Sequence, residues 1–379
     1  MAIQTEEVRH LADFAPEDCI VTTVYLDVNA GEFPDTDHLQ TSLHSVIHDA
    51  GVRRGAIEET LSHDAQTSLR ADLKKIKAYV GGEFAREDSN GVAIFSCSAH
   101  DFWRVILLPH RVDNAMVFGP RPHLAPLAPF LSHHKPTAIL LTGKEHARIL
   151  SMEGGELKEW ADFEDFVPQR SEQGAWSQSR YQRRSDHWMK HHIDKAAALA
   201  LRLQKFYPFD WLVLGAEVQS ETEVKNSLHP YLKDSVIGTI HVRVDAPNAE
   251  ILEHAQAAIE RAESELIGNL VAQVQEFAGA GGRGTAGLTD TVNALNEQRV
   301  HILLVQQGYS APGSICSNCN MLMAQRVDRC PGCDEPAVHV DNLVDYAVQR
   351  AYESGSTVEV ATEEDALEPI GCVAAVLYY

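Results

Sequence analysis

Four of the seven cysteines stand in two closely spaced pairs, Cys316-Ser-Asn-Cys319 and Cys330-Pro-Gly-Cys333, with residues 320–329 between them. Each pair lets two thiolates chelate one ion through a tight turn, and the Pro-Gly of the second pair suits such a turn. Four thiolates predict a closed tetrahedral Zn²⁺ site that leaves no position for water. The predicted role of the metal is therefore structural. Free dithiols, a redox CxxC pair and an iron–sulfur cluster are the alternatives.

A second candidate site is the stretch EQGAWSQSRYQRR, Glu172–Arg184, because its charge opposes that of the chain. The formal net charge of −22 argues against nonspecific nucleic-acid binding, yet three arginines here face a single acid. Guanidinium groups pair with phosphates, and aromatic rings stack on bases. We therefore expect a local contact with RNA. The side chains expected to make it are Trp176, Arg180, Tyr181, Arg183, Arg184 and His187.

The histidines that follow this stretch have a less specific pattern. His187 and His191 are spaced i, i+4 and could hold a metal ion together, but no third ligand is apparent beyond Asp186 and Asp194. We expect a polar helix face there, partly charged against RNA.

The elements that must position these sites fall into three blocks. In residues 1–132, Cys19–Val28 alternates as a strand does, Thr36–Ala50 and Ala56–Val80 predict helices, and a hairpin is expected around Ala99–Asp101. The block ends in a Pro-rich stretch, FGPRPHLAPLAPFL, that predicts an extended linker.

In residues 133–245, a hairpin precedes a polar segment, Asp162–Ser185, whose length without periodicity is typical of a functional loop. A helix is expected from about Ser185 to Phe206. Its apolar face carries Met189, Ile193, Ala196, Ala200 and Leu203. A buried strand at Asp210–Ala216, a helix at Glu221–Leu232 and a strand at Val236–Val244 then predict a parallel α/β layer.

In residues 246–379, a long helix at Ala249–Phe277 is followed by AGAGGRG, which lacks the Lys-Ser/Thr of a phosphate-binding loop and predicts a flexible linker. Helices at Leu288–Glu297 and Asp341–Ser354 alternate with apolar strands around the cysteine cluster. The predicted fold class is therefore α/β in three domains, each α/β, with a zinc-ribbon insert in the C-terminal domain.

Composition limits the setting of the protein. The chain has no run of about 18 apolar residues, which argues against a membrane span. The N-terminus lacks a basic region followed by an apolar core, so we expect a cytoplasmic protein without a secretory signal. Cys19, Cys97 and Cys372 lie in apolar segments and are expected to be buried free thiols.

Two parts of the chain resemble a known family. The C-terminal block has a Gly-rich loop, a helix, a strand, a CxxC pair set, a helix and the closing stretch GCVAAVLYY, Gly371–Tyr379. The run Ser179–Arg184 keeps an Arg-aromatic-x-Arg pattern ahead of a long helix. In both features the chain resembles the archaeal and eukaryotic class-1 peptide chain release factors and Pelota. Its likeness extends to their bacterial relatives, which include the ribosome hibernation factor Balon.

The chain departs from that family at two motifs. Catalytic members carry GGQ, where this chain has Gly174-Ala175-Trp176-Ser177-Gln178, so the resemblance makes Gln178 the candidate catalytic residue in a degenerate motif. Members that read stop codons carry a NIKS loop, which Gly51–Gly55 lacks. The resemblance therefore implies no reading of stop codons.

The resemblance implies a ribosome-binding translation factor that occupies the A site without hydrolysis, in hibernation or rescue. Its expected partners are the ribosome, through ribosomal RNA and tRNA, and a translational GTPase. The alternative is an enzyme, a peptidyl-tRNA hydrolase that uses Gln178. A third hypothesis is a protein-interaction factor that uses only the zinc finger and the acidic surface.

Overall fold

The computed structural model describes residues 10–33, 35–51, 55, 58, 61–85, 89–133, 135–153, 156–165, 178–216, 220–278 and 282–379. For residues 36, 83, 153 and 178–185 it describes the backbone alone. The chain divides into two compact units, one of residues 133–269 and one of residues 3–132 with 270–379. The further division into three domains, at 132 and 245, stays a prediction. None of the described helices has the length and apolar character needed to cross a membrane.

The first sheet is antiparallel and has the strand order β3-β2-β1-β4. The strands are β1 (Val21–Asp27), β2 (Gly91–Cys97), β3 (Phe102–Leu108) and β4 (Ala115–Gly119). Helices α2 (Thr36–Asp49) and α4 (His63–Ala78) bury their apolar stripes against one face of this sheet. The predicted hairpin is confirmed, since β2 and β3 pair and are joined by η2 (Ser98–His100).

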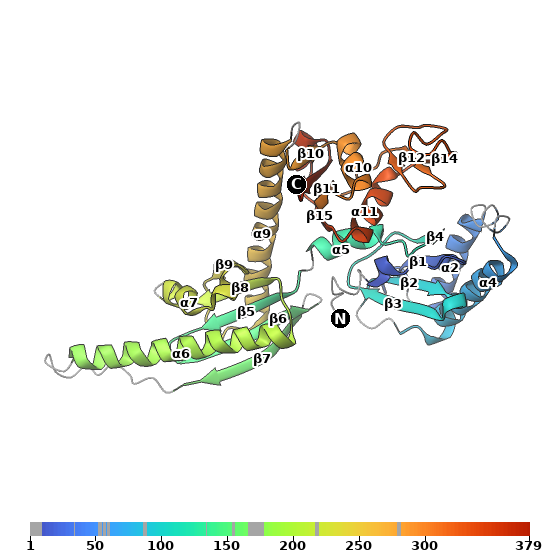
Figure 1. Ribbon diagram of the computed structural model, residues 1–379. Coiled ribbons are helices and arrows are strands. Elements are labelled where there is room, and N and C mark those ends of the chain that lie inside the picture. The colour runs from blue at the N-terminus through green and yellow to red at the C-terminus, as the bar shows by residue number, and fades with distance from the viewer. Residues whose placement is uncertain are drawn as a thin grey trace. The chain divides into compact units, whose positions relative to one another are not determined.

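The other face of this sheet packs against C-terminal elements of the same unit (Figure 1). The Pro-rich stretch belongs to this core, so the prediction of an extended linker is wrong. It forms two short helices, η3 (Ala125–Leu127) and α5 (Ala128–His133). Leu124 and Leu127 are fully buried there, and the backbone N–H of Leu124 donates to Gln349 at 2.9 Å. Apolar residues between the prolines thus drive the stretch into the core.

The C-terminal sheet has the order β10-β16-β11-β15 and mixes strand directions. The strands are β10 (Gly284–Ala286), β16 (Val373–Leu377), β11 (Val300–Gln306) and β15 (Thr357–Ala361), and the helices beside them are α10 (Leu288–Asn296) and α11 (Leu343–Glu353). Only the last residue of the predicted Gly-rich linker, Gly284, is in β10, where residues 284–286 pair with β16. Residues 279–281 of that linker lie outside the described residues. Gly287 and Gly371 both have positive φ, and a Cβ on Gly371 would lie 2.9 Å from the Gly287 Cα. Only glycine permits this close approach.

The sheet of the middle unit has the order β7-β6-β5-β8-β9. The strands are β5 (Thr137–Thr142), β6 (His146–Glu153), β7 (Glu156–Glu164), β8 (Trp211–Ala216) and β9 (Val236–Ile240). Strands β5, β8 and β9 are parallel, as predicted, and β6 and β7 add an antiparallel edge. The predicted helix Glu221–Leu232 is two helices, α7 (Glu221–Ser227) and α8 (Pro230–Lys233), because proline cannot continue a helix.

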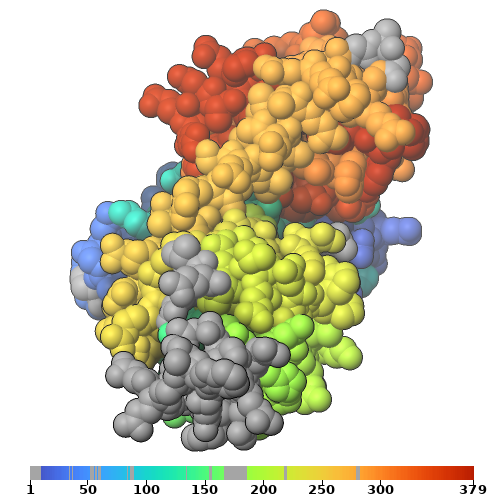
Figure 2. Space-filling model, turned by 90° about the vertical axis from the view of Figure 1, so that its left-hand side faces the viewer, coloured from blue at the N-terminus to red at the C-terminus, as the bar shows by residue number. Residues whose placement is uncertain are grey.

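Two long helices cover opposite faces of this sheet. Alternate residues of β5 and β8 contact α6 (Gln178–Phe206) on one side and the first turns of α9 (Asn248–Phe277) on the other. Helix α9, gold in Figure 2, has an exposed side along much of its length. The sheet thus forms a rigid base from which α6 extends.

Candidate functional site

Helix α6 begins seven residues earlier than the sequence predicted, at Gln178 instead of Ser185. Its first two turns contain glutamine and arginine, which have high helix propensity and extend the helix N-terminally from its packed half. The basic run Ser179–Arg184 is therefore helical backbone, not loop.

The first half of α6 extends past the core that holds its second half (Figure 1). The predicted apolar face is confirmed, since Ile193, Ala196, Ala200 and Leu203 are buried and Met189 packs at the edge of the cluster. Asp186, His187 and Trp188, one turn earlier, are exposed. The helix is thus solvated on its polar face and unpacked at its beginning, which leaves these side chains accessible.

The residues predicted to bind RNA are only partly described. Trp176 lies outside the described residues, as do the side chains on the first turns of α6. His187 is exposed on the projecting part of α6. Trp188, which sequence reasoning missed, has 39% of its surface exposed, and its ring centre lies 6.4 Å from that of His191. An exposed tryptophan next to a basic run was the signal that could have identified it. The structure describes only the backbone of five of the predicted site residues, namely Gln178, Arg180, Tyr181, Arg183 and Arg184.

A charged cluster joins the end of β7 to α6. The buried ring of His192 donates from Nδ1 to Asp165 at 2.8 Å, and the ammonium of Lys195 donates to the other oxygen of Asp165 at 2.7 Å. The bonds from Lys195 and then His192 lower the pKa of Asp165. Asp165 precedes residues 166–177, and His192 and Lys195 lie 14 and 17 residues into α6, so the cluster joins the end of β7 to the packed half of the helix. Sequence reasoning missed it, since a contact over 27 residues leaves no local pattern.

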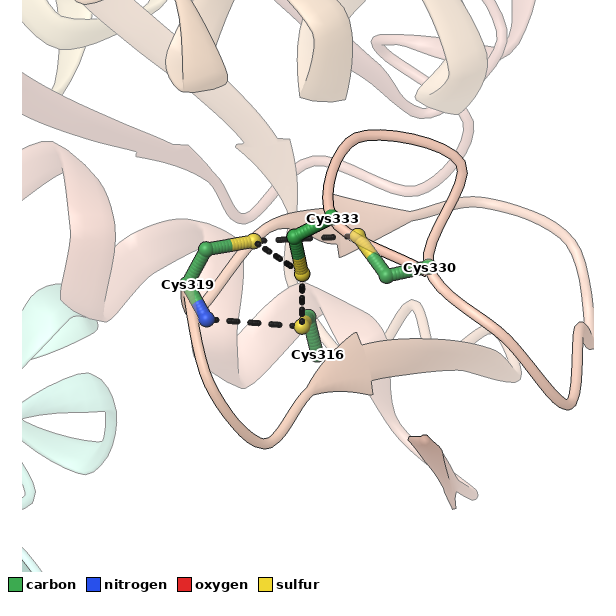
Figure 3. Close-up of side chains that lie close together, drawn as sticks. All are labelled: Cys316, Cys319, Cys330 and Cys333. Atoms are coloured by element: carbon green, nitrogen blue, oxygen red, sulfur yellow. Dashed lines mark hydrogen bonds between the residues drawn. The ribbon is translucent and has the colours of Figure 1, made fainter. Parts of the chain in front are cut away.

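The four clustered cysteines converge as their spacing predicts. Figure 3 shows their sulfurs pointing toward one another. The sulfur of Cys333 lies 3.4 Å from that of Cys316 and 3.6 Å from that of Cys319, which is 3.6 Å from that of Cys330. Four thiolates around Zn²⁺, each at about 2.3 Å, would be about 3.8 Å apart. The four cysteines could therefore bind one metal ion with little movement.

The two CxxC turns have the same backbone geometry. After the first, Asn320 donates its N–H to the Cys316 carbonyl at 3.1 Å; after the second, Asp334 donates to the Cys330 carbonyl at 2.9 Å. Both residues have φ of 59°, a left-handed conformation that Asn and Asp tolerate. The turns are mounted on a sheet of order β13-β12-β14, whose strands are β12 (Gly313–Cys316), β13 (Leu322–Met323) and β14 (Ala337–Val340).

Backbone N–H groups also prepare these sulfurs to carry negative charge. The N–H groups of Cys319 and Asn318 each donate to the Cys316 sulfur at 3.4 Å, and Gly332 donates to the Cys330 sulfur at 3.4 Å. The donation from Cys319 is the main cause that lowers the pKa of Cys316 to about 6. A thiolate is the form that binds a metal ion. The donor set and its hydrogen bonds thus fit a thiolate-bound cation.

Comparison with known proteins supports the family resemblance at the level of sequence. Residues 122–260 match the model of bacterial archaeo-eukaryotic release factor family 10. The chain is 22% identical over 355 residues to peptide chain release factor subunit 1 of Thermococcus sibiricus, covering 86% of this chain and 83% of the relative. The similarity to release factors that the motifs indicated is thereby confirmed. The family match extends from η3 to the first turns of α9 and so includes α6.

Matches among solved structures are weaker. A structure of ribosome-bound archaeal Pelota with ABCE1 matches at 13% identity over 73% of this chain and 72% of that one, with a TM-score of 0.42. Dom34 of S. cerevisiae matches at 11% identity over 73% of this chain and 74% of that one, with a TM-score of 0.39. TM-scores of this size do not establish a common fold.

Proposed function

We propose that this protein is a ribosome-binding translation factor of the release factor and Pelota type. It occupies the A site without hydrolysing peptidyl-tRNA, and it acts in ribosome hibernation or rescue in the cytoplasm. The observation that carries the proposal is the family match over residues 122–260, because that segment contains both the degenerate GGQ-like stretch and the projecting basic end of α6.

The charge distribution supports an RNA contact at this end of α6. The chain has a formal net charge of −22, so most of its surface is repelled by phosphate. Arg180, Arg183 and Arg184 concentrate positive charge at one end of a helix whose exposed neighbours are His187 and Trp188. Phosphate pairing with base stacking is the contact that these residue types favour.

The composition of the GGQ-like stretch argues against hydrolysis of peptidyl-tRNA. Glycines let a loop backbone enter a crowded site because they have no Cβ, and here Ala175 and Trp176 stand where that freedom is needed. Gln178 is separated from Gly174 by three residues and begins α6. We infer that the stretch contacts RNA and leaves the peptidyl ester intact.

The proposed role of the four cysteines is a structural zinc ribbon. Thiolates at four positions would fill the coordination sphere of Zn²⁺, so the ion would order the sheet β13-β12-β14 and activate no water. The ribosome and a translational GTPase are the proposed partners. This rests on analogy: Pelota is described as ribosome-bound with ABCE1, and Dom34 as interacting with Hbs1.

Cosedimentation with 70S ribosomes over a range of salt concentrations tests the proposal. We expect binding that weakens as salt rises, because phosphate contacts release counterions. Replacing Arg180, Arg183 and Arg184 together by Ala should weaken binding and flatten its salt dependence. The matched control replaces Arg202 and Lys205, both exposed at the other end of α6, and should bind as wild type does. No ribosome association at any salt concentration would overturn the proposal.

Peptide release from stalled complexes tests the hydrolytic alternative separately. The proposal expects background release of labelled peptide by the wild-type protein and by Gln178→Ala alike. Release by the wild type that is lost in Gln178→Ala would instead establish a peptidyl-tRNA hydrolase.

A further inference from the structure

Two cysteines outside the metal cluster meet at one corner of the first sheet. The sulfurs of Cys19 and Cys97 are 2.7 Å apart. A disulfide bond measures about 2.05 Å, whereas the sulfurs of the metal cluster stay 3.4–3.6 Å apart. The sulfur–sulfur distance of Cys19 and Cys97 is therefore closer to that of a disulfide bond than to that of two thiolates on one metal ion. Sequence reasoning expected two unrelated buried thiols here.

The register of the sheet explains why the two sulfurs meet. Thr22 of β1 lies opposite Ser96 of β2, so one further step brings Val21 opposite Cys97. Cys19 lies in the bend two residues before Val21, outside β1. The chain at this bend passes close to the end of β2, where the two sulfurs meet.

The two thiols differ in their access to solvent. Cys97 is fully buried, whereas Cys19 is partly exposed. The hydrogen-bonded pair of His100 and Asp18, 2.9 Å apart, lies beside Cys19 at the surface. A small oxidant would therefore reach Cys19 first, and Cys97 would be the second thiol.

We propose that Cys19 and Cys97 are a modification site, a thiol pair that a hydroperoxide oxidises to a disulfide. The thiolate of Cys19 attacks hydrogen peroxide and breaks the O–O bond, which gives a sulfenic acid and one water once the thiol proton is counted. The sulfur of Cys97 then attacks the sulfur of Cys19, and the oxygen leaves with the Cys97 proton as a second water. Two thiols lose two electrons and two protons, and one peroxide is reduced to two waters.

The surroundings make this oxidation slow at neutral pH. Burial raises the pKa of the Cys19 thiol, and the hydrogen bond to Cys97 and the charges of Cys97, Asp18 and Asp72 raise it further. The thiolate is then a small fraction that grows about tenfold for each pH unit. Among the described residues, His100 is a further titratable group beside the pair. The disulfide would therefore form only under sustained exposure to peroxide. It would be reversible, as disulfides in reducing compartments usually are.

Peptide mapping without reduction, on the full chain with zinc supplied, tests the proposal. Trypsin separates the two thiols into peptides 10–53 and 87–104, each with one cysteine. After treatment with hydrogen peroxide we expect these peptides to be linked, with the product about 2 Da lighter than the pair of thiols and restored by dithiothreitol. The rate of linking should rise about tenfold per unit between pH 7 and 9.

Two variants distinguish the pair from a general effect of oxidation. Cys19→Ser, at the partly exposed position, should abolish the link, whereas Cys372→Ser, directly before β16, should leave it unchanged. Absence of the linked peptide in oxidised wild-type protein would overturn the proposal. A second equivalent of zinc that is lost in Cys19→Ser would overturn it in favour of a metal site formed with Asp18 and His100.

Discussion

The imidazole of His192 donates to the carboxylate of Asp165 across 2.8 Å, and this bond connects the end of β7 to the first buried turn of α6. Lys195 donates to the second carboxylate oxygen at 2.7 Å. The GGQ-like stretch lies between Asp165 and the first turn of α6, so this cluster fixes the segment before it and the packed half of the helix after it. The cluster thereby anchors the packed half of α6 against the end of β7, from which the first half of the helix projects.

Replacement of the carboxylate tests this anchor. Asp165→Asn should lower the free energy of unfolding by about 1.5–3 kcal/mol, the range for hydrogen bonds to charged groups. The control Asp162→Asn removes a carboxylate that is 47% exposed and bound to His146, and should cost less than about 1 kcal/mol. Denaturant unfolding of the two variants measures the difference. Equal losses would show that the anchor adds nothing beyond a surface ion pair.

The anchor also predicts how stability depends on pH. The pKa of Asp165 is lowered in the folded protein by Lys195 and His192, so this carboxylate contributes stability above its unfolded pKa of about 3.9. That contribution is lost as pH falls through the folded pKa. The difference in unfolding free energy between wild type and Asp165→Asn should therefore shrink below about pH 4. Denaturant unfolding at pH 3–7 checks the sign, and a difference that grows toward acid pH would contradict it.

Metal removal tests the cysteine cluster. We expect about one equivalent of zinc per chain, and we expect a chelator to unfold the sheet β13-β12-β14 because the metal–sulfur bonds that join the two CxxC turns are then lost. Cys330→Ser should lose the metal, and Cys372→Ser should keep it. Elemental analysis with hydrogen exchange of residues 313–340 provides the measurement. Full protection of that segment after metal removal would assign the cluster no structural role.

A close contact between two glycines gives a prediction about stability. Gly371 has φ of 83°, and an added Cβ would meet the Gly287 Cα at 2.9 Å, so Gly371→Ala should destabilise the protein by more than about 1 kcal/mol. Gly268 is the matched control, since it lies in α9 with nothing within 4 Å of an added Cβ. Gly268→Ala should stabilise the protein by about 0.5–1 kcal/mol. Thermal unfolding separates the two variants, and shifts of the same sign would contradict the argument.

The parts of the fold that the sequence predicted are those with strong local periodicity. The short apolar runs of β5, β8 and β11 indicate buried strands. The apolar face of α6 repeats at helical spacing through Ile193, Ala196 and Ala200. The metal-binding cysteines were equally predictable, because each pair is local and only the meeting of the two pairs depends on tertiary structure.

Features that depend on distant partners could not be predicted. The Pro-rich stretch contains the same turn residues as a linker, and only burial of Leu124 and Leu127 between two sheets makes it part of the core. The bond between His192 and Asp165 and the contact between Cys19 and Cys97 join residues 27 and 78 apart. Both follow from strand register and helix placement, which no window of sequence contains.

An exposed tryptophan beside the basic run supplies a test of the RNA contact that does not involve charge. Trp188 has 39% of its surface exposed on the projecting part of α6, and it does not belong to the apolar cluster that α6 forms with the sheet. If its ring stacks on a base, Trp188→Ala should weaken ribosome binding by roughly 5- to 150-fold, since stacking contributes about 1–3 kcal/mol per base. The loss should persist at high salt, because stacking releases no counterions.

Phe206→Ala is the control for this tryptophan, since Phe206 is the more exposed aromatic residue at the opposite end of the same helix. It should bind ribosomes as the wild type does. Cosedimentation of both variants at two salt concentrations provides the measurement. Equal binding by Trp188→Ala and the wild type would leave the arginines as the whole contact, and equal losses in both variants would point to a damaged helix instead of a lost base contact.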